Sequence, residues 1–350
     1  MSSIELSLAD GWTQVEPLET GFELLISGQS PGQTLILTDT AFRHQQEIGF
    51  SGGSNCPLAV DENGRRVFVS VDGIVSYGFH ESAKKVCKVS EEASPFWMLA
   101  YNPTGNELVM HLNGEEPSQS FIGRLDLENG NCQRHQLPEG AIFPLALGST
   151  FDKVLYSNRN GAAVYHFDHE IQALASIELP HSVFGGAFDA DERRVILGGN
   201  GIWGWDTTSG STSRLCESGM YPVIDGGGDI WFALRDGALA KLNSTNCRYN
   251  VIVELSGLDT SSSKTGSYAQ PIVFSPDKRF GLARLTGREK LSGKDLEVAE
   301  AFCNSVAQPF SEFHRYRYEH YFCVLDLVLQ QAWCSEGYAH NVAWLSSRSV

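Results

Sequence analysis

The sequence lacks the marks of several large protein classes. Its first residues, MSSIELSLADGW, hold no basic segment followed by an apolar one, so we expect no secretory signal. Its apolar runs are far shorter than the ~20 residues that a membrane-spanning helix needs. The eight cysteines form no CxxC pair, which argues against zinc ribbons and thioredoxin-like redox sites. These absences favour a cytoplasmic protein that has no membrane partner.

Recognisable cofactor and metal motifs are also missing. The sequence contains neither HExxH nor a phosphate-binding loop, and GGGD at residues 226–229 fits a turn between strands. His166, Asp168 and His169 are close in sequence, but residues three apart in a strand point to opposite faces. Joint metal ligation would therefore need a turn between them. We expect no cofactor, no bound metal and no catalytic residue.

Basic residues are scarce relative to acidic ones. The chain has 26 Lys and Arg against 42 Asp and Glu, which gives a formal net charge of −16. Such a chain repels nucleic acid and anionic membrane surfaces, and it attracts basic partners. The alternative interpretation is that the acidity only keeps the protein soluble.

What the sequence does contain is a repeat. A short apolar strand is followed by a polar turn, a second apolar strand, a third strand ending near Asp or Asn, and a fourth strand. The first turn of each copy aligns, and successive turns lie 41, 46, 41, 36 and 50 residues apart. These turn positions are Asp61, Asn102, Gly148, Asp189, Asp225 and Ser275. Blades of β-propellers repeat at ~40–45 residues, so six complete four-stranded blades are predicted.

A seventh blade is split between the two ends of the chain. The tail AHNVAWLSSRSV predicts an innermost strand at residues 341–345, whereas FELLISG, QTLILTD and FRHQQEIGF predict three strands that lack an innermost one. Pairing the C-terminal strand with the N-terminal strands would complete the blade and remove free sheet edges. We therefore predict one all-β domain over residues 1–350, a propeller of seven four-stranded blades. A pair of β-sandwiches, another β-solenoid, or six or eight blades are the alternatives.

Several short motifs support this fold. The turns DENGRR, DADERR and SPDKRF, together with Trp205-Asp206 at the end of a third strand, resemble the degenerate WD40/YVTN class of propellers. The resemblance covers almost the whole chain but is generic, and it implies the fold without identifying functional residues.

Binding residues are expected where the blades connect. Connections from one blade's fourth strand to the next blade's first strand converge near the central channel. Three of them share a Glu-x3-aromatic spacing, and other rings and histidines lie in the same connections. The insertion in the sixth repeat, which we expect on the same face, adds Arg315 and Arg317. The candidate binding residues are Glu92, Phe96, Glu139, Phe143, His181, Glu217, Tyr221, Tyr268, Arg315, Arg317, Glu336, Tyr338 and His340. Carboxylates between aromatic rings suit Lys or Arg side chains; the alternative is that the rings pack between blades and the glutamates are simply solvated. His181 and His340 could meet near the axis.

The sixth repeat contains the largest insertion, at residues 286–318. Within it, SGKDLEVAEAFCNSVAQPF predicts a helix that Ser292 could cap and that Pro309 follows. Its apolar stripe comprises Leu296, Ala299, Phe302, Cys303 and Val306, which we expect to pack on the propeller rather than on a partner.

The cysteines are expected to be free thiols in a reducing compartment, with one exception. Cys323 and Cys334 are equidistant from the centre of VLDLVLQQAW. If that segment is a hairpin, they face each other and could form a disulfide in an oxidising environment.

Two classes of function remain. The first is a non-enzymatic binding module for a basic protein or peptide, either a scaffold or an inhibitor of the immunity-protein type. The alternative is a hydrolase or lactonase-like enzyme that acts on a small polar substrate in the central channel, and a structural or sensor role is a further option. The charge and the rim of carboxylates and rings favour the binding module.

Overall fold

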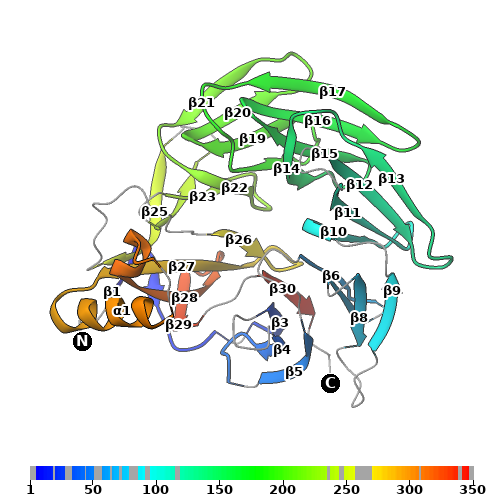
Figure 1. Cartoon of the computed structure of the whole chain (residues 1–350). Coiled ribbons are helices and arrows are strands. Elements are labelled where there is room, and N and C mark those ends of the chain that lie inside the picture. The colour runs from blue at the N-terminus through cyan, green and yellow to red at the C-terminus, as the bar shows by residue number, and fades with distance from the viewer. Residues whose placement is uncertain are drawn as a thin grey trace.

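A computed structural model of the chain shows seven β-sheets arranged as blades around a centre (Figure 1). The structure describes residues 5–18, 20–27, 34–43, 45–50, 57–63, 65–70, 73–78, 86–90, 95–114, 119–234, 237–243, 248–256, 270–306, 309–337 and 341–346. Within each blade the four strands follow one another as an antiparallel meander. The prediction of a seven-bladed all-β propeller is confirmed.

The first four blades are regular four-stranded sheets. Blade 1 contains β6 (Leu58–Asp61), β7 (Arg66–Ser70), β8 (Ile74–Gly78) and β9 (Val86–Ser90). Blade 2 contains β10 (Pro95–Asn102), β11 (Glu107–Asn113), β12 (Ser120–Asp126) and β13 (Cys132–Gln136). Blade 3 contains β14 (Ala141–Leu147), β15 (Lys153–Asn158), β16 (Gly161–Phe167) and β17 (Ile171–Glu178). Blade 4 contains β18 (Gly185–Phe188), β19 (Arg194–Gly199), β20 (Gly201–Asp206) and β21 (Thr212–Cys216).

The other three blades include strands from the chain ends. Blade 5 contains β22 (Met220–Ile224), β23 (Ile230–Ala233), β24 (Leu239–Leu242) and β25 (Tyr249–Ser256), with β1 (Glu5–Leu8) added outside. Blade 6 contains β26 (Gln270–Phe274), β27 (Phe280–Lys290), β28 (Tyr316–Asp326) and β29 (Gln331–Glu336), with β2 (Thr13–Gln14) outside. Blade 7 contains β30 (Asn341–Ser346), β3 (Phe22–Ser27), β4 (Thr34–Asp39) and β5 (Gln45–Phe50).

The innermost strands form an unbroken circle. Each contacts the innermost strand of the next blade, from β6 through β10, β14, β18, β22 and β26 to β30, which in turn contacts β6. Blade 7 is the split blade that the sequence predicts, because β30 pairs antiparallel with β3 and places Leu345 opposite Glu23. Figure 1 shows the red β30 beside the blue β3 and β4. The two ends of the chain therefore share one sheet.

The aligned turn positions of the repeat fall where the sequence predicts. Each one ends or directly follows an innermost strand, as Asp61 does in β6 and Asp189 does after β18. These turns need a left-handed residue three or four positions later, such as Arg65 or Glu192, which both have positive φ. The third strands end in a second recurring turn. In it the Oδ1 atom of Asp206 accepts hydrogen bonds from the backbone N–H groups of Thr208 and Ser209.

The core lies between the blades. Leu155 of blade 3 packs in one cluster with Leu197 and Trp205 of blade 4, and all three are fully or almost fully buried. Both faces of a blade's middle strands are covered by neighbouring blades, so these strands are apolar at successive positions, as in RVILGG of β19. This packing holds adjacent blades rigidly in register and fixes the loops at their ends.

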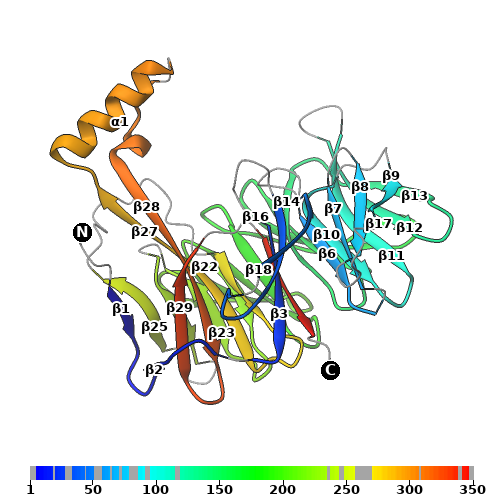
Figure 2. The same cartoon turned by 90° about the horizontal axis from the view of Figure 1, so that it is seen from below.

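The first strands of the chain were not anticipated. β1 pairs antiparallel with β25 of blade 5, and β2 pairs parallel with β29 of blade 6, before the chain enters blade 7. Trp12 lies between them and meets Trp231 edge to face, with ring centroids 6.5 Å apart. This segment runs along the outer edges of two blades, as Figure 2 shows. It covers edges that would otherwise be unpaired.

The insertion in blade 6 is an arm that projects from the ring (Figure 2). β27 and β28 stay paired out to Lys290 and Tyr316, and helix α1 (Gly293–Ser305) and the 3₁₀ helix η1 (Glu312–Arg315) lie between them. The helix prediction is confirmed, although the Ser292 side chain makes no capping hydrogen bond. Neither described helix is long and apolar enough to cross a membrane.

The apolar stripe of α1 packs less completely than we expected. Cys303 is buried and Leu296 and Ala299 are half-buried, but Phe302 is 63% exposed and Val306 is also exposed. The expectation that the stripe packs on the propeller is therefore wrong for Phe302 and Val306. The physical reason is that the long β27–β28 hairpin carries the helix beyond the blades, and among the described elements α1 has close contacts with η1.

The segment between Cys323 and Cys334 is a hairpin, as the sequence suggests. The two residues pair across β28 and β29, and they form a disulfide. Among the described cysteines, Cys216 and Cys303 are free thiols.

Candidate functional site

One face of the ring carries the connections between blades, and we call it the mouth face. It also carries the loops between second and third strands, whereas the turns between first and second strands lie on the opposite, far face. Several predicted binding residues cannot be placed there. Glu92, Tyr268, Tyr338 and His340 lie outside the described residues, and so do the side chains of Phe96 and Arg317.

The predicted residues that are described do not share one environment. Glu139 is exposed beside the start of β14, and Phe143, in β14, is half-buried. Glu217 is exposed, but its Oε2 atom lies 2.7 Å from Nη1 of Arg214. Tyr221 is half-buried in β22. The equal Glu-x3-aromatic spacing therefore does not produce equal pairs of carboxylate and ring.

Two further predicted residues lie in or beside the arm. Glu336 ends β29 and is exposed, and Arg315 ends η1 and is exposed. The Arg315 guanidinium carbon lies 5.9 Å from the centroid of the Phe310 ring. Arg315 is thus held within the arm, away from the described glutamates of the connections between blades.

Large apolar side chains are exposed where innermost strands begin on the mouth face. Trp97 of β10 is 54% exposed, Ile142 of β14 is 51% exposed, and Phe184, just before β18, is 43% exposed. These strands belong to consecutive blades and contact one another. We define Trp97, Ile142, Phe184 and Tyr221 as the mouth rim. Three of these residues are exposed and Tyr221 is half-buried. A row of apolar residues that is largely exposed is typical of an interaction surface.

β-bulges place three of the four residues of this rim, Trp97, Ile142 and Tyr221. The pairing of β10 shifts between Pro95 and Leu99, and that of β22 shifts between Met220 and Val223. Trp97 and Tyr221 lie inside these bulges with φ values of 68° and 51°. A left-handed backbone costs a residue with a side chain of order 1–3 kcal/mol, and such strain is concentrated where proteins hold ligands.

Close packing holds one of these strained residues in place. A Cβ atom on Gly185 would lie 2.5 Å from the Tyr221 Cα atom, so only glycine allows β18 and β22 to approach this closely. Gly185 directly follows Phe184. Two members of the mouth rim are therefore fixed next to each other across the boundary between blades 4 and 5.

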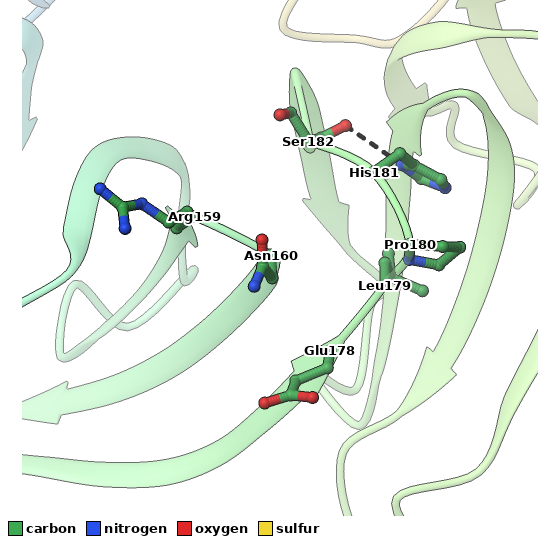
Figure 3. A pocket seen from close by; sticks show the side chains of 7 residues that line it. All are labelled: Arg159, Asn160, Glu178, Leu179, Pro180, His181 and Ser182. Atoms are coloured by element: carbon green, nitrogen blue, oxygen red, sulfur yellow. Dashed lines mark hydrogen bonds between the residues drawn. The ribbon is translucent and has the colours of Figure 1, made fainter.

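A pocket lies on the mouth face at the boundary between blades 3 and 4 (Figure 3). Its volume is about 530 Å³. It is lined by Arg159, Asn160, Glu178, Leu179, Pro180, His181 and Ser182, which come from the β15–β16 turn and the β17–β18 connection. The backbone N–H of Leu179 donates to the Asn160 carbonyl oxygen at 2.7 Å, so the two segments are bonded to each other.

His181 is the one predicted binding residue that lines this pocket. Its Nδ1 atom donates to the Ser182 carbonyl oxygen at 3.1 Å, and its ring centroid lies 5.8 Å from that of Trp203. Figure 3 shows the imidazole directed away from Arg159 and Glu178. On the far side of the stack, the Arg214 guanidinium carbon lies 5.6 Å from the Trp203 ring. His181 therefore packs against blade 4, and His340, its proposed partner, lies outside the described residues.

The side chains of His166 and His169 do not share a common carboxylate partner. His166 Nε2 lies 3.6 Å from Asp152, whereas His169 Nε2 lies 3.7 Å from Asp168. Within the described part of the chain, no three His, Cys, Asp or Glu side chains are arranged to hold a metal ion.

Sequence reasoning missed the most exposed residues of this face. It selected Phe143 and not the neighbouring Ile142, because the Glu-x3-aromatic spacing from Glu139 leads to Phe143. A β-bulge adds one residue and reverses which side chains point outward. Shifts in pairing register mark the bulges in the structure, and no residue type in the sequence indicates them. Arg159 and Glu178 were missed because neither stands in a recognisable motif.

Comparison with known proteins gives the fold. No family model and no curated protein matches the chain. Among solved structures, a putative 6-phosphogluconolactonase from Bacteroides uniformis has a TM-score of 0.56 at 11% identity, covering 93% of this chain and 99% of its own. Kuenenia stuttgartiensis hydrazine synthase has a TM-score of 0.56 at 15% identity, with 81% and 95% coverage.

A third similar structure is a chain of the mitotic checkpoint complex. Its TM-score is 0.53 at 14% identity, and the match covers 80% of this chain and 87% of the other. At such low identity the likeness extends to the fold alone. The chain is a seven-bladed β-propeller, and these comparisons identify no family for it.

Proposed function

We propose that the protein is a non-enzymatic binding module that holds a basic protein or peptide on its mouth face. The observation that carries this proposal is the mouth rim, which exposes large apolar side chains on consecutive blades. Rigid aromatic anchors supply much of the energy in protein interfaces, and a half-exposed Trp is well suited to that role. Holding Trp97 and Tyr221 in a strained backbone presents their rings in a fixed position before the partner arrives.

Charge supports the basic nature of the partner. The chain has a net charge of −16, and Glu139 and Glu217 are exposed on the same face as the rim. The Phe302 surface of α1, which projects beyond the ring, offers the partner a second apolar contact. Electrostatic attraction would speed association, while the rim would slow dissociation.

The enzyme alternative has less support. The sequence contains one GxSxG match, GQSPG at residues 28–32, but the described strands on either side of it are β3 and β4. The nucleophile elbow that this pattern marks joins a strand to a helix, so its context here is wrong. Likeness to a putative lactonase in fold does not transfer its chemistry.

The proposal can be tested by comparing two double variants as bait in affinity capture from source-cell extract. The first carries Trp97→Ala and Phe184→Ala on the mouth rim. The matched control carries Val328→Ser and Leu329→Ser, which are also exposed apolar residues but lie in the β28–β29 turn on the far face. We expect the rim variant to lose stoichiometric partners that the wild type and the control retain. Equal capture by both variants would contradict the proposal, as would stoichiometric partners that are acidic.

A further inference from the structure

The pocket between blades 3 and 4 displays opposite charges on its two walls. Arg159 comes from the β15–β16 turn and Glu178 ends β17, and both side chains are exposed. Within the described part of the chain, neither forms an ion pair with another residue, nor do they pair with each other. Figure 3 shows Arg159 and Glu178 on either side of Asn160. A ligand with one negative and one positive group could satisfy both.

The pocket floor is rigid enough to position such a ligand. Leu179 is buried and bonded to the Asn160 carbonyl, and Val183 is almost fully buried on the other side of the connection. The hydrogen bond from His181 to the Ser182 carbonyl, with the stack on Trp203, fixes the intervening turn. The backbone segments that carry Arg159 and Glu178 are therefore held in position before a ligand binds, which lowers the ordering cost of binding.

We propose that this pocket binds the carboxyl-terminal lysine or arginine of a peptide. The planar guanidinium of Arg159 would bind the terminal carboxylate in the bidentate geometry that this pair prefers, and the Asn160 amide could donate beside it. Glu178 would bind the basic side chain through its carboxylate. This inference rests on the proposed function, since it defines which end of a basic partner the mouth face recognises.

The class of ligand follows from the charges. A ligand with only a positive charge would be attracted by Glu178 but repelled by Arg159. A ligand with only a negative charge would be attracted by Arg159 but repelled by Glu178 and by the net negative charge of the protein. A carboxyl-terminal basic residue carries both charges a few bonds apart. An amino-terminal acidic residue carries them too, and the probes below separate the two.

The test uses three capped peptides and calorimetry on the intact protein. The probes are acetyl-Gly-Gly-Lys as the free acid, the same peptide as the carboxyl-terminal amide, and acetyl-Gly-Gly-norleucine as the free acid. We expect the lysine acid to bind about tenfold or more tightly than either other probe, because each removes one charge-assisted contact. Glu-Gly-Gly-amide, which carries an amino-terminal acidic residue, should bind no better than the weaker probes.

Variants assign each preference to one residue. Arg159→Gln should abolish the preference for acid over amide, and Glu178→Gln should abolish the preference for lysine over norleucine. Arg193→Gln and Glu170→Gln make the same charge changes in turns on the far face and should leave both preferences intact. Equal binding of the three lysine and norleucine probes to the wild type would overturn the inference, as would tighter binding of Glu-Gly-Gly-amide.

The peptide-binding test of this pocket and the affinity-capture test of the proposed function can succeed or fail independently. If the mouth-rim variant loses its partners while the probes bind equally, the proposed function stands and the pocket assignment fails. If the probes are discriminated while the rim variant keeps its partners, the pocket is a binding site but the rim is not.

Discussion

The imidazole Nδ1 of His111 lies 2.7 Å from the hydroxyl oxygen of Tyr156, and this contact joins β11 of blade 2 to β15 of blade 3 inside the core. The other ring nitrogen lies 3.1 Å from Oδ1 of Asn113, an acceptor, so it carries the proton. Nδ1 therefore accepts from the Tyr156 hydroxyl. Both ring nitrogens are satisfied only while His111 is neutral.

This arrangement predicts that the free energy of unfolding decreases as the pH falls from neutral into the mildly acidic range. Burial lowers the pKa of His111, and burial also lowers the pKa of His135. The unfolded chain then takes up protons at pH values where the folded chain does not. Stability should be complete above the unfolded histidine pKa of about 6.5 and should fall as the pH drops below it.

The measurement is urea unfolding at about pH 7.5 and about pH 5.5. Wild type should lose free energy of unfolding at the lower pH, and His111→Gln should lose less. His169→Gln replaces an exposed imidazole and should behave like wild type. An unchanged pH dependence in His111→Gln would show that this buried contact is not the sensitive group.

A second prediction compares two aspartates in the same kind of turn. Asp326 is 1% exposed, accepts from the backbone N–H groups of Val328 and Leu329, and lies 2.7 Å from Nη2 of Arg279. Asp206 makes the same turn in blade 4, without an ion pair to an arginine among the described contacts.

Asp326→Ala should therefore cost more stability than Asp206→Ala. The Asp326 change removes a charge-assisted contact worth about 1.5–3 kcal/mol in addition to the turn bonds. Thermal melts of the two variants test this, and equal losses would mean that the Arg279 contact contributes nothing. Burial alone would raise the pKa of Asp326, but the hydrogen bond from Arg279 and the turn N–H groups outweigh it and lower the pKa. The stabilisation that Asp326 provides to the folded protein should thus vanish in strong acid, because its carboxyl group becomes protonated.

The C-terminal strand should be essential for folding. Removing residues 341–350 would take Trp344 and Leu345 from the core and leave the inner edge of β3 unpaired, while its other edge stays paired with β4. We expect an insoluble protein or one with a much lower melting temperature. The milder Trp344→Ala also removes the bond from its indole N–H to the Val273 carbonyl in blade 6 and should cost about 3–5 kcal/mol. Wild-type melting of either variant would contradict the split blade.

The Cys323–Cys334 disulfide should contribute measurable stability. A bridge that closes a loop of this length is worth about 2–3 kcal/mol in the chain-entropy account. Reductant should lower the melting temperature of the wild type and leave that of the Cys323→Ala, Cys334→Ala double variant unchanged. Identical responses would mean that the bridge is not formed in solution.

Alkylation of the protein in intact cells would further test the expected cytoplasmic residence, because cytosolic thiols normally stay reduced.

Much of the fold follows from local chemistry that the sequence displays. Asp61 and Asp189 mark first turns because short polar side chains stabilise tight turns, and their regular spacing reveals the blades. The position of Trp12 could not be predicted from local sequence chemistry. Its segment pairs with strands more than 200 residues away, and short edge strands carry little pattern of their own.

The sequence indicates a face for the candidate site but not its detail. The loop argument selects the mouth face, and the structure shows that His181 lines a pocket there. It could not identify Trp97, because a bulge decides which side chains are exposed. It also could not foresee that Arg214 would engage Glu217, since that pair depends on the local path of β21.

The central claim, that the mouth face holds the partner, is tested most directly by hydrogen exchange of the protein with and without a captured stoichiometric partner. Backbone amides at the strand starts around Trp97, Ile142, Phe184 and Tyr221 should exchange more slowly in the complex. Amides in the far-face turns after Asp61 and Asp189 should exchange equally in both states. Protection of those turns, with none at the strand starts, would contradict the account.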